Sequence, residues 1–190
     1  MERTPLPGFL NFPVSEQEQE RERIASALTS MNFKKNETVF AQGDVCRQIY
    51  FIRSGLVKLS YLTFEGKEMI KSFITEGHMF GSLYSQLTGK GSTFNAVALE
   101  PLELDVMEYG LLQELTENNP AMQKMLSQFF QRLALKKELR EYELLCLSAP
   151  QRYQKVCEEH PEWVARIKQA DLALYLGITP IALSRLKHRK

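Results

Sequence analysis

Residues 169–190, QADLALYLGITPIALSRLKHRK, predict two short helices joined by a tight turn. Gly177 ends the first helix because glycine adopts a positive φ at little cost. Thr179 can cap the second helix, and Pro180 suits its first turn, where a missing N–H costs nothing. Ala173 is small enough to let the two helices cross closely. The inward-facing positions recur at helical spacing: Leu172, Ala173, Leu176, Leu183 and Leu186.

The outward face of the second helix is polar and basic. A helix of this kind after a tight turn is typical of a helix-turn-helix that reads the major groove of DNA. We expect Arg185 to contact a base edge and the residues after it to contact phosphates. An ordinary helical hairpin with a solvated basic end is the simpler alternative. The candidate DNA-binding residues are Thr179, Ile181, Ser184, Arg185, Lys187, His188 and Arg189.

The charge of the chain is distributed unevenly, although its net charge is only +1. From residue 148 onward there are 8 Lys and Arg against 4 Asp and Glu, whereas the first 147 residues carry 16 against 19. This asymmetry favours a near-neutral N-terminal part joined to a phosphate-binding module. The 190 residues, 44% of them hydrophobic, suffice for one good core and a smaller second unit.

Several classes of protein are disfavoured by what the sequence lacks. Cys46, Cys146 and Cys157 are too few and too far apart for a zinc or iron–sulfur site, so we expect free thiols in a reducing cytoplasm. We expect no signal peptide, because no apolar stretch follows the first basic residue, and no apolar run approaches about 20 residues. Paired carboxylates, a nucleophile–histidine spacing and a phosphate-binding loop are also missing. We therefore expect a cytoplasmic protein that is not an enzyme, does not bind membranes, and needs no metal or cofactor.

The middle of the chain alternates between apolar and polar residues and predicts strands. Glycines at 43, 55, 66, 77 and 89 punctuate it every eleven or twelve residues. This spacing, with no helix between the strands, favours an antiparallel jelly roll over a looser α+β sheet. The predicted strands are TVFA (38–41), QIYFIRS (48–54), LVKLSYLTF (56–64), EMIKSFI (68–74), FNAVAL (94–99) and LELDVM (102–107).

Helical patterns flank this region. Residues 15–30 predict a short charged helix, capped by Ser15, that turns Ile24, Ala27 and Leu28 inward. Residues 120–147 predict a long helix that ends at Ser148-Ala149-Pro150, with shorter helices near 150–159 and 163–167. The apolar face of the long helix is wide enough to favour a dimer seam over packing within one chain. The candidate seam residues are Met122, Met125, Leu126, Phe129, Phe130 and Leu133.

The predicted fold class is therefore α+β, in four parts. Residues 1–30 form an N-terminal arm and short helix, and residues 31–117 an antiparallel β-roll that acts as a sensor domain. Residues 118–147 form the dimerisation helix, and residues 148–190 the small helix-turn-helix domain.

Four stretches resemble the Crp/Fnr family of bacterial transcription regulators. They are FAQGDVCRQIYFIRSGLVKLSY (40–61), EGHMFGS (76–82), SAPQRYQKV (148–156) and QADLALYLGITPIALSRLK (169–187). The resemblance covers about residues 30–190 and implies that residues 31–117 are similar to a cyclic-nucleotide-binding roll. It also implies a homodimer that binds a double-stranded DNA operator of two-fold symmetry, with RNA polymerase as a further candidate partner.

The sequence departs from the family members that bind cyclic AMP. Those members follow the Phe-Gly pair with a glutamate for the ribose, and place an arginine before a Ser or Thr for the phosphate. Here the two positions hold Ser82 and Gly91, with only Lys90 nearby. A buried phosphate needs a charge-assisted partner, so we expect no response to cyclic AMP. The candidate ligand pocket is Phe80, Gly81, Ser82, Lys90, Ser92 and Thr93.

The resemblance also bears on the operator sequence and on the role of His78. The family's usual base-reading arginine and glutamate fall near Pro180 and Ile181, so the operator should differ from that of the cyclic-AMP regulator. His78 lies in a turn, where a solvated histidine is favoured over a haem ligand. The alternative to a DNA-binding regulator is a ligand- or cyclic-nucleotide-binding module whose helix-turn-helix contacts proteins instead.

Overall fold

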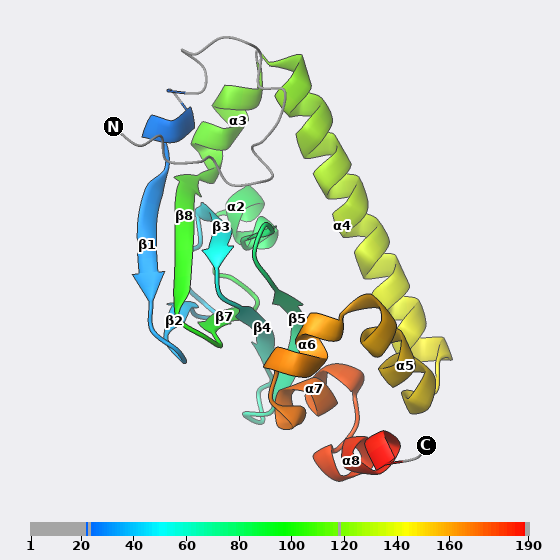
Figure 1. Ribbon diagram of the computed structural model, residues 1–190. Coiled ribbons are helices and arrows are strands. Elements are labelled where there is room, and N and C mark those ends of the chain that lie inside the picture. Colours follow the sequence, from blue (N-terminus) through cyan, green and yellow to red (C-terminus); the bar gives the residue numbers. More distant parts are fainter. Residues whose placement is uncertain (1–21, 23, 118, 189–190) are drawn as a thin grey trace.

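The computed structural model of the chain describes residues 22, 24–117 and 119–188. Its N-terminal part is a roll of two four-stranded sheets, shown at the left of Figure 1. Every strand pairing in them is antiparallel. One sheet has the order β1 (Thr29–Phe33), β8 (Leu102–Glu108), β3 (Gln48–Ser54), β6 (Met79–Phe80). The other has the order β2 (Thr38–Phe40), β7 (Asn95–Ala98), β4 (Val57–Leu62), β5 (Glu68–Ile74).

The roll confirms the predicted fold class and all six predicted strands. The glycines at 43, 55, 66, 77 and 89 all have positive φ; the first four lie in turns between strands, and Gly89 is the C-cap of a short helix. Gly55 is also a point of close approach, since a Cβ there would lie 2.6 Å from the carbonyl oxygen of Pro101. β1 and the two-residue β6 were not predicted from the sequence. The expectation of no helix between the strands was wrong, because α2 (Leu83–Thr88) follows β6.

The end of the roll beside its N-terminus is closed by helices. Described residues before β1 are helical only as far as Ser26, so the predicted helix to residue 30 was too long at its C-terminal end. Ile24 is buried as predicted, whereas Ser15 lies outside the described residues. α3 (Tyr109–Glu117), which the sequence did not predict, packs with Ile24 against the outer face of β3 and β8.

α4 (Pro120–Cys146) is the long helix predicted from residues 120–147, and it spans 27 residues. It runs the length of the molecule from α3 to the C-terminal helices (Figure 1). Its first turns pack into the same core as α3, through Met122 and the partly buried Leu126. Ser148 and Gln151 then form a capping box where the next helix starts, so the predicted break after α4 is confirmed.

Four short helices complete the described chain. They are α5 (Ala149–Glu159), α6 (Pro161–Arg166), α7 (Gln169–Leu176) and α8 (Pro180–His188). α7 contacts β5, so this helical unit rests on the second sheet, and α8 lies at the far end from the roll's N-terminal helices (Figure 1). None of the described helices is long and apolar enough to cross a membrane.

Candidate nucleic-acid interface and its contact with the roll

The turn between α7 and α8 has the predicted local structure. Gly177 caps α7 in the left-handed region with φ 68°. The N–H of Ile178 donates to the carbonyl of Ala173 at 3.0 Å, which closes the turn. Thr179 caps α8, because its hydroxyl accepts from the N–H of Ala182 at 3.2 Å. Ala173 and Leu183 are fully buried where the helices meet. The short capped turn therefore fixes the angle at which α8 leaves α7.

The outward face of α8 is open to solvent. Ile181 is 67% exposed, and Thr179, Arg185 and His188 are also exposed. Ser184 and Lys187 are half-buried, and Arg189 lies outside the described residues. The structure thus places the described candidate DNA-binding residues along α8, with Ile181, Arg185 and His188 facing away from the buried Leu183, and Lys187, four residues after Leu183, beside it.

An aromatic cluster holds the helical unit on the roll. Phe73 of β5 meets Trp163 of α6 edge-on, with ring centroids 5.3 Å apart, and Tyr175 of α7 at 5.7 Å. Trp163 and Tyr175 also pack edge to face at 5.3 Å. All three are buried and share one core with Leu56 and Ile70 of the roll. Edge-to-face pairs of this kind add about 0.5–1.5 kcal/mol beyond the burial of their area.

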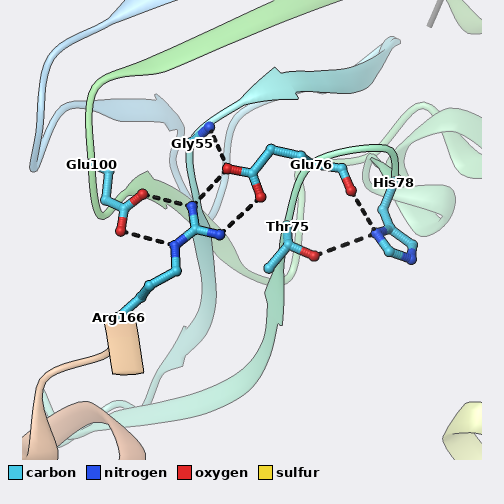
Figure 2. A network of polar contacts seen from close by, with 6 residues as sticks. All are labelled: Gly55, Thr75, Glu76, His78, Glu100 and Arg166. Carbon is cyan, nitrogen blue, oxygen red and sulfur yellow. Dashed lines mark hydrogen bonds and ion pairs between the residues drawn. The ribbon is translucent and has the colours of Figure 1, made fainter. Parts of the chain in front are cut away.

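Arg166, three residues after Trp163 in α6, forms a fork of ion pairs with the roll (Figure 2). The guanidinium of Arg166 donates to both carboxylate oxygens of Glu76, at 2.7 and 2.9 Å, and to both of Glu100, at 2.6 and 3.1 Å. Glu76 also accepts from the N–H of Gly55 at 3.0 Å. The Arg166 hydrogen bond lowers the pKa of Glu76 to about 2. One arginine of the helical unit therefore joins two turns of the roll.

Further contacts fix α7 from its other sides. Lys58 of β4 lies 3.5 Å from the Asp171 carboxylate. Arg152 of α5 donates to the carbonyl of Leu176 at 3.0 Å, and Arg140 of α4 stacks over the ring of Tyr175 at 3.8 Å. These partners, and Arg166 with them, could not be predicted from the sequence, because they lie far apart in the chain and no spacing pattern links them.

The predicted ligand-pocket residues gather around α2 and the start of β7. Ser82 is fully buried and serves as the N-cap of α2, where its hydroxyl accepts from the N–H of Ser85. The hydroxyl of Ser92 donates to the carbonyl of Phe94 at 2.8 Å. Gly81 is half-buried, whereas Lys90 and Thr93 are exposed. Both buried hydroxyls of this set are therefore engaged within the roll.

Aromatic rings fill the space between the two sheets near this set. Phe80 stacks on Tyr50 with centroids 5.0 Å apart, and Phe40 lies 5.7 Å from Tyr50 and 5.5 Å from Phe94. All four are buried in the core between the sheets. Burial raises the pKa of the Tyr50 hydroxyl, with nearby Cys46 as a further cause. This cluster leaves the Tyr50 hydroxyl as an uncharged group in an apolar setting.

Gly91 has no room for a side chain. A Cβ at this position would lie 2.3 Å from the carbonyl oxygen of Gly43. The two segments are held together by the hydrogen bonds Gly43 N–H to Ser92 O, at 2.8 Å, and Ser92 N–H to Asp44 O, at 2.7 Å. An arginine at position 91 is therefore incompatible with this turn.

The predicted seam residues of α4 differ in their surroundings. Met122 and Met125 are buried within the chain itself, and Leu126 packs against the same core. Phe129, Phe130 and Leu133 are half-buried. Further along the helix, four exposed apolar residues share one side, Leu135, Leu139, Tyr142 and Leu145, while the exposed Leu144 lies on another side. The apolar surface that a partner can reach is therefore the C-terminal half of α4.

Residues 30–119 match the family described as "Cyclic nucleotide-binding domain". The global nitrogen regulator of Nostoc sp. is 33% identical over 96 residues, covering 50% of this chain and 43% of that protein. The fumarate and nitrate reduction regulatory protein of Vibrio cholerae is 26% identical over 167 residues, covering 82% of this chain and 66% of that protein. The chain thus spans less than two thirds of the length of these relatives, both of which are named as regulators and not as enzymes.

The fold is also that of a solved regulator. The structure of the Thermus thermophilus catabolite activator protein superposes with a TM-score of 0.58 at 22% identity, covering 92% of this chain and 84% of the other. The matched roll, the named relatives and the shared order of roll, long helix and C-terminal helices agree with one another. The roll therefore matches the cyclic nucleotide-binding domain, and the chain is similar to these regulatory proteins, as its resemblance to the Crp/Fnr family implies.

Proposed function

We propose that this regulator binds DNA sequence-specifically through α8, as a homodimer, and does not respond to cyclic AMP. The single observation that carries the proposal is the solvent-exposed polar face of α8, which follows α7 after a short, capped turn. The exposed Arg185 stands on this face, opposite the buried Leu183. An arginine so placed can pair with the two acceptors of a guanine edge in the major groove. A regulator of this kind acts on chromosomal DNA, in the cytoplasm.

The dimer would form along the C-terminal half of α4. Leu135, Leu139, Tyr142 and Leu145 follow one another at intervals of three or four residues, so they share a face of the helix. Leu145 is 77% exposed, and the other three are between 43% and 54% exposed. An apolar stripe of this length on a single exposed helix favours pairing with a second copy. A two-fold dimer would present two α8 helices to successive major grooves, with RNA polymerase as a predicted further partner.

The roll offers cyclic AMP neither of the charged groups that its ribose and phosphate need. Ser82 caps α2 and holds no carboxylate. Gly91 lies against the backbone of Gly43, and Lys90 points into solvent. A phosphate desolvated without a cation would be strongly disfavoured. These features support the proposal that the roll does not recognise cyclic AMP.

The test is DNA binding by the whole chain, measured by fluorescence anisotropy on genomic fragments enriched by the wild-type protein. We expect Arg185→Ala to weaken the specific site by about 1–3 kcal/mol and to relax the preference at one base pair. We expect Lys187→Ala to weaken all sequences alike and to lower the salt slope by about one. Lys67→Ala, in the exposed turn between β4 and β5, is the matched control and should change neither.

Two outcomes would contradict the proposal in different ways. If Arg185→Ala loses the same affinity for specific and for random DNA, Arg185 does not read a base. A wild-type protein without salt-dependent DNA binding would favour the alternative function, in which the helix pair contacts another protein.

A further inference from the structure

A cavity of about 250 Å³ lies where α4, β5 and the C-terminal helices meet. It is separate from the predicted ligand pocket, since none of Phe80, Gly81, Ser82, Lys90, Ser92 and Thr93 lines it. Its wall combines apolar side chains, among them Val156 and Tyr175, with many cations. The cations come from β5, α4 and α5: Lys71, Arg132, Lys136, Lys137, Arg140 and Lys155.

The acids of the cavity neutralise only part of this charge. Glu143 pairs with Lys155 at 3.0 Å and with Arg140 at 3.5 Å. Glu159 pairs with the same Lys155 at 3.5 Å. Within the described chain, the other four cations have no carboxylate partner: Lys71, Arg132, Lys136 and Lys137. The cavity therefore gathers several positive charges that the protein itself does not compensate.

Lys71 shows that these charges affect one another. Its ammonium lies 3.4 Å from the centroid of the Phe94 ring, half-buried at the roll's edge. Burial, together with the charge of Lys137 on α4, lowers the pKa of Lys71 to about 7. An anion placed between Lys71 and Lys137 would therefore stabilise the charged form of Lys71.

We propose that this cavity is a binding site for a small organic polyanion, with at least two negative charges and a compact apolar body. Phosphate esters and di- or tricarboxylates share this chemistry. The anionic groups would lie between Lys71 of β5 and Lys136 and Lys137 of α4. The apolar part would lie against Val156 and Tyr175. Such a ligand bridges the roll, the long helix and the helical unit, because each contributes to the wall.

The ligand would consequently act on the position of the helical unit. Lys136 lies 5.7 Å from the ring of Trp163, and Tyr175 belongs to the cluster that docks α7 on β5. Leu135 and Leu139 border the cavity and also belong to the proposed dimer seam. Binding at the cavity does not depend on DNA binding, so the two proposals can fail separately.

The test is a thermal-shift and calorimetric titration of the whole chain with inorganic phosphate, pyrophosphate and citrate, at constant ionic strength. We expect saturable stabilisation by pyrophosphate or citrate, and a weaker effect of phosphate, which carries less charge. Tighter binding of pyrophosphate would favour a phosphate ester as the ligand, and tighter binding of citrate would favour a di- or tricarboxylate. The double variant Lys71→Gln/Lys137→Gln should bind at least tenfold more weakly, while the control Lys67→Gln should bind as the wild type does.

A second variant keeps the test decisive if the double variant fails to fold. Lys136→Gln changes an exposed position, so it should fold and still weaken binding severalfold. Trp163 fluorescence should respond to the anion in the wild type, because the single tryptophan lies beside the cavity's lysines. The proposal is overturned if none of the three anions gives saturable binding, or if the cavity variants and Lys67→Gln bind equally.

Discussion

Removing the guanidinium of Arg166 should loosen the helical unit from the roll. In Arg166→Ala, Glu76 and Glu100 face each other across an empty site, and the bidentate pairs to both are lost. The pKa of Glu76 falls from 4.5 to about 2 in the folded chain, which corresponds to about 3 kcal/mol at face value. The side chain of Glu76 is 39% exposed, so solvent screening reduces this figure. We expect a loss of about 1–2 kcal/mol.

The pH dependence follows from the direction of the pKa shift. Because folding lowers the pKa of Glu76, its contribution to stability is complete above the unfolded value of 4.5. The contribution is lost progressively as the pH falls from about 4.5 to about 2. The stability difference between wild type and Arg166→Ala should therefore be full at pH 7, and less than half of it should remain at pH 3.

Trp163 makes this measurable, because it is the single tryptophan of the chain and is buried at the interface in question. Urea titrations followed by its fluorescence should show an earlier transition for Arg166→Ala, and an intermediate one for Arg166→Lys, which keeps the charge but not the fork. Arg47→Ala, an exposed arginine of the roll, is the matched control. Identical transitions for Arg166→Ala and wild type at pH 7, or a difference that does not shrink at pH 3, would refute the reasoning.

Three more predictions concern the roll and the dimer. Gly91→Ala should cost about 1–3 kcal/mol by thermal unfolding, because its Cβ would lie 2.3 Å from the Gly43 carbonyl oxygen; Gly110→Ala, on α3 with open space around it, is the control and should be neutral or stabilising. Leu139→Glu should give a monomer in light scattering at micromolar concentration, because it would place a charge in the proposed α4 dimer interface. A dimer that persists in this variant would show that the interface lies elsewhere. Millimolar cyclic AMP should leave the melting temperature unchanged, and a clear stabilisation lost in Lys90→Ala would reverse our interpretation of the roll.

The elements best predicted from the sequence were those with strong local periodicity. Six strands, the long helix and the four C-terminal helices follow patterns that lie within ten to thirty residues. The turn at Gly177 was predictable because glycine alone adopts its φ of 68° at little cost. By contrast, β6 has only two residues, too few to establish a period. α2 buries only Ser85, so no apolar face marks it as a helix.

The features that join distant segments were not predictable in this way. Arg166 meets Glu76 across 90 residues, and nothing in the spacing of either residue marks it as a partner. Met122 and Met125 looked like seam residues because a helical pattern shows that a face is apolar, not what covers it. In the structure, the chain's own core covers both of them.

Two side chains of β5, separated by one residue, have different surroundings. Phe73 packs against Trp163 and Tyr175 and so sets where α7 rests. Lys71, two positions earlier, reaches the cavity beside α4. Packed interiors resist small deformations and respond by shifting whole elements. An anion drawing Lys71 toward α4 would therefore act on the strand that seats α7. Because the short turn at Gly177 fixes α8 to α7, such a shift would reach the side chains of α8 that we propose to contact DNA, without any contact between ligand and α8.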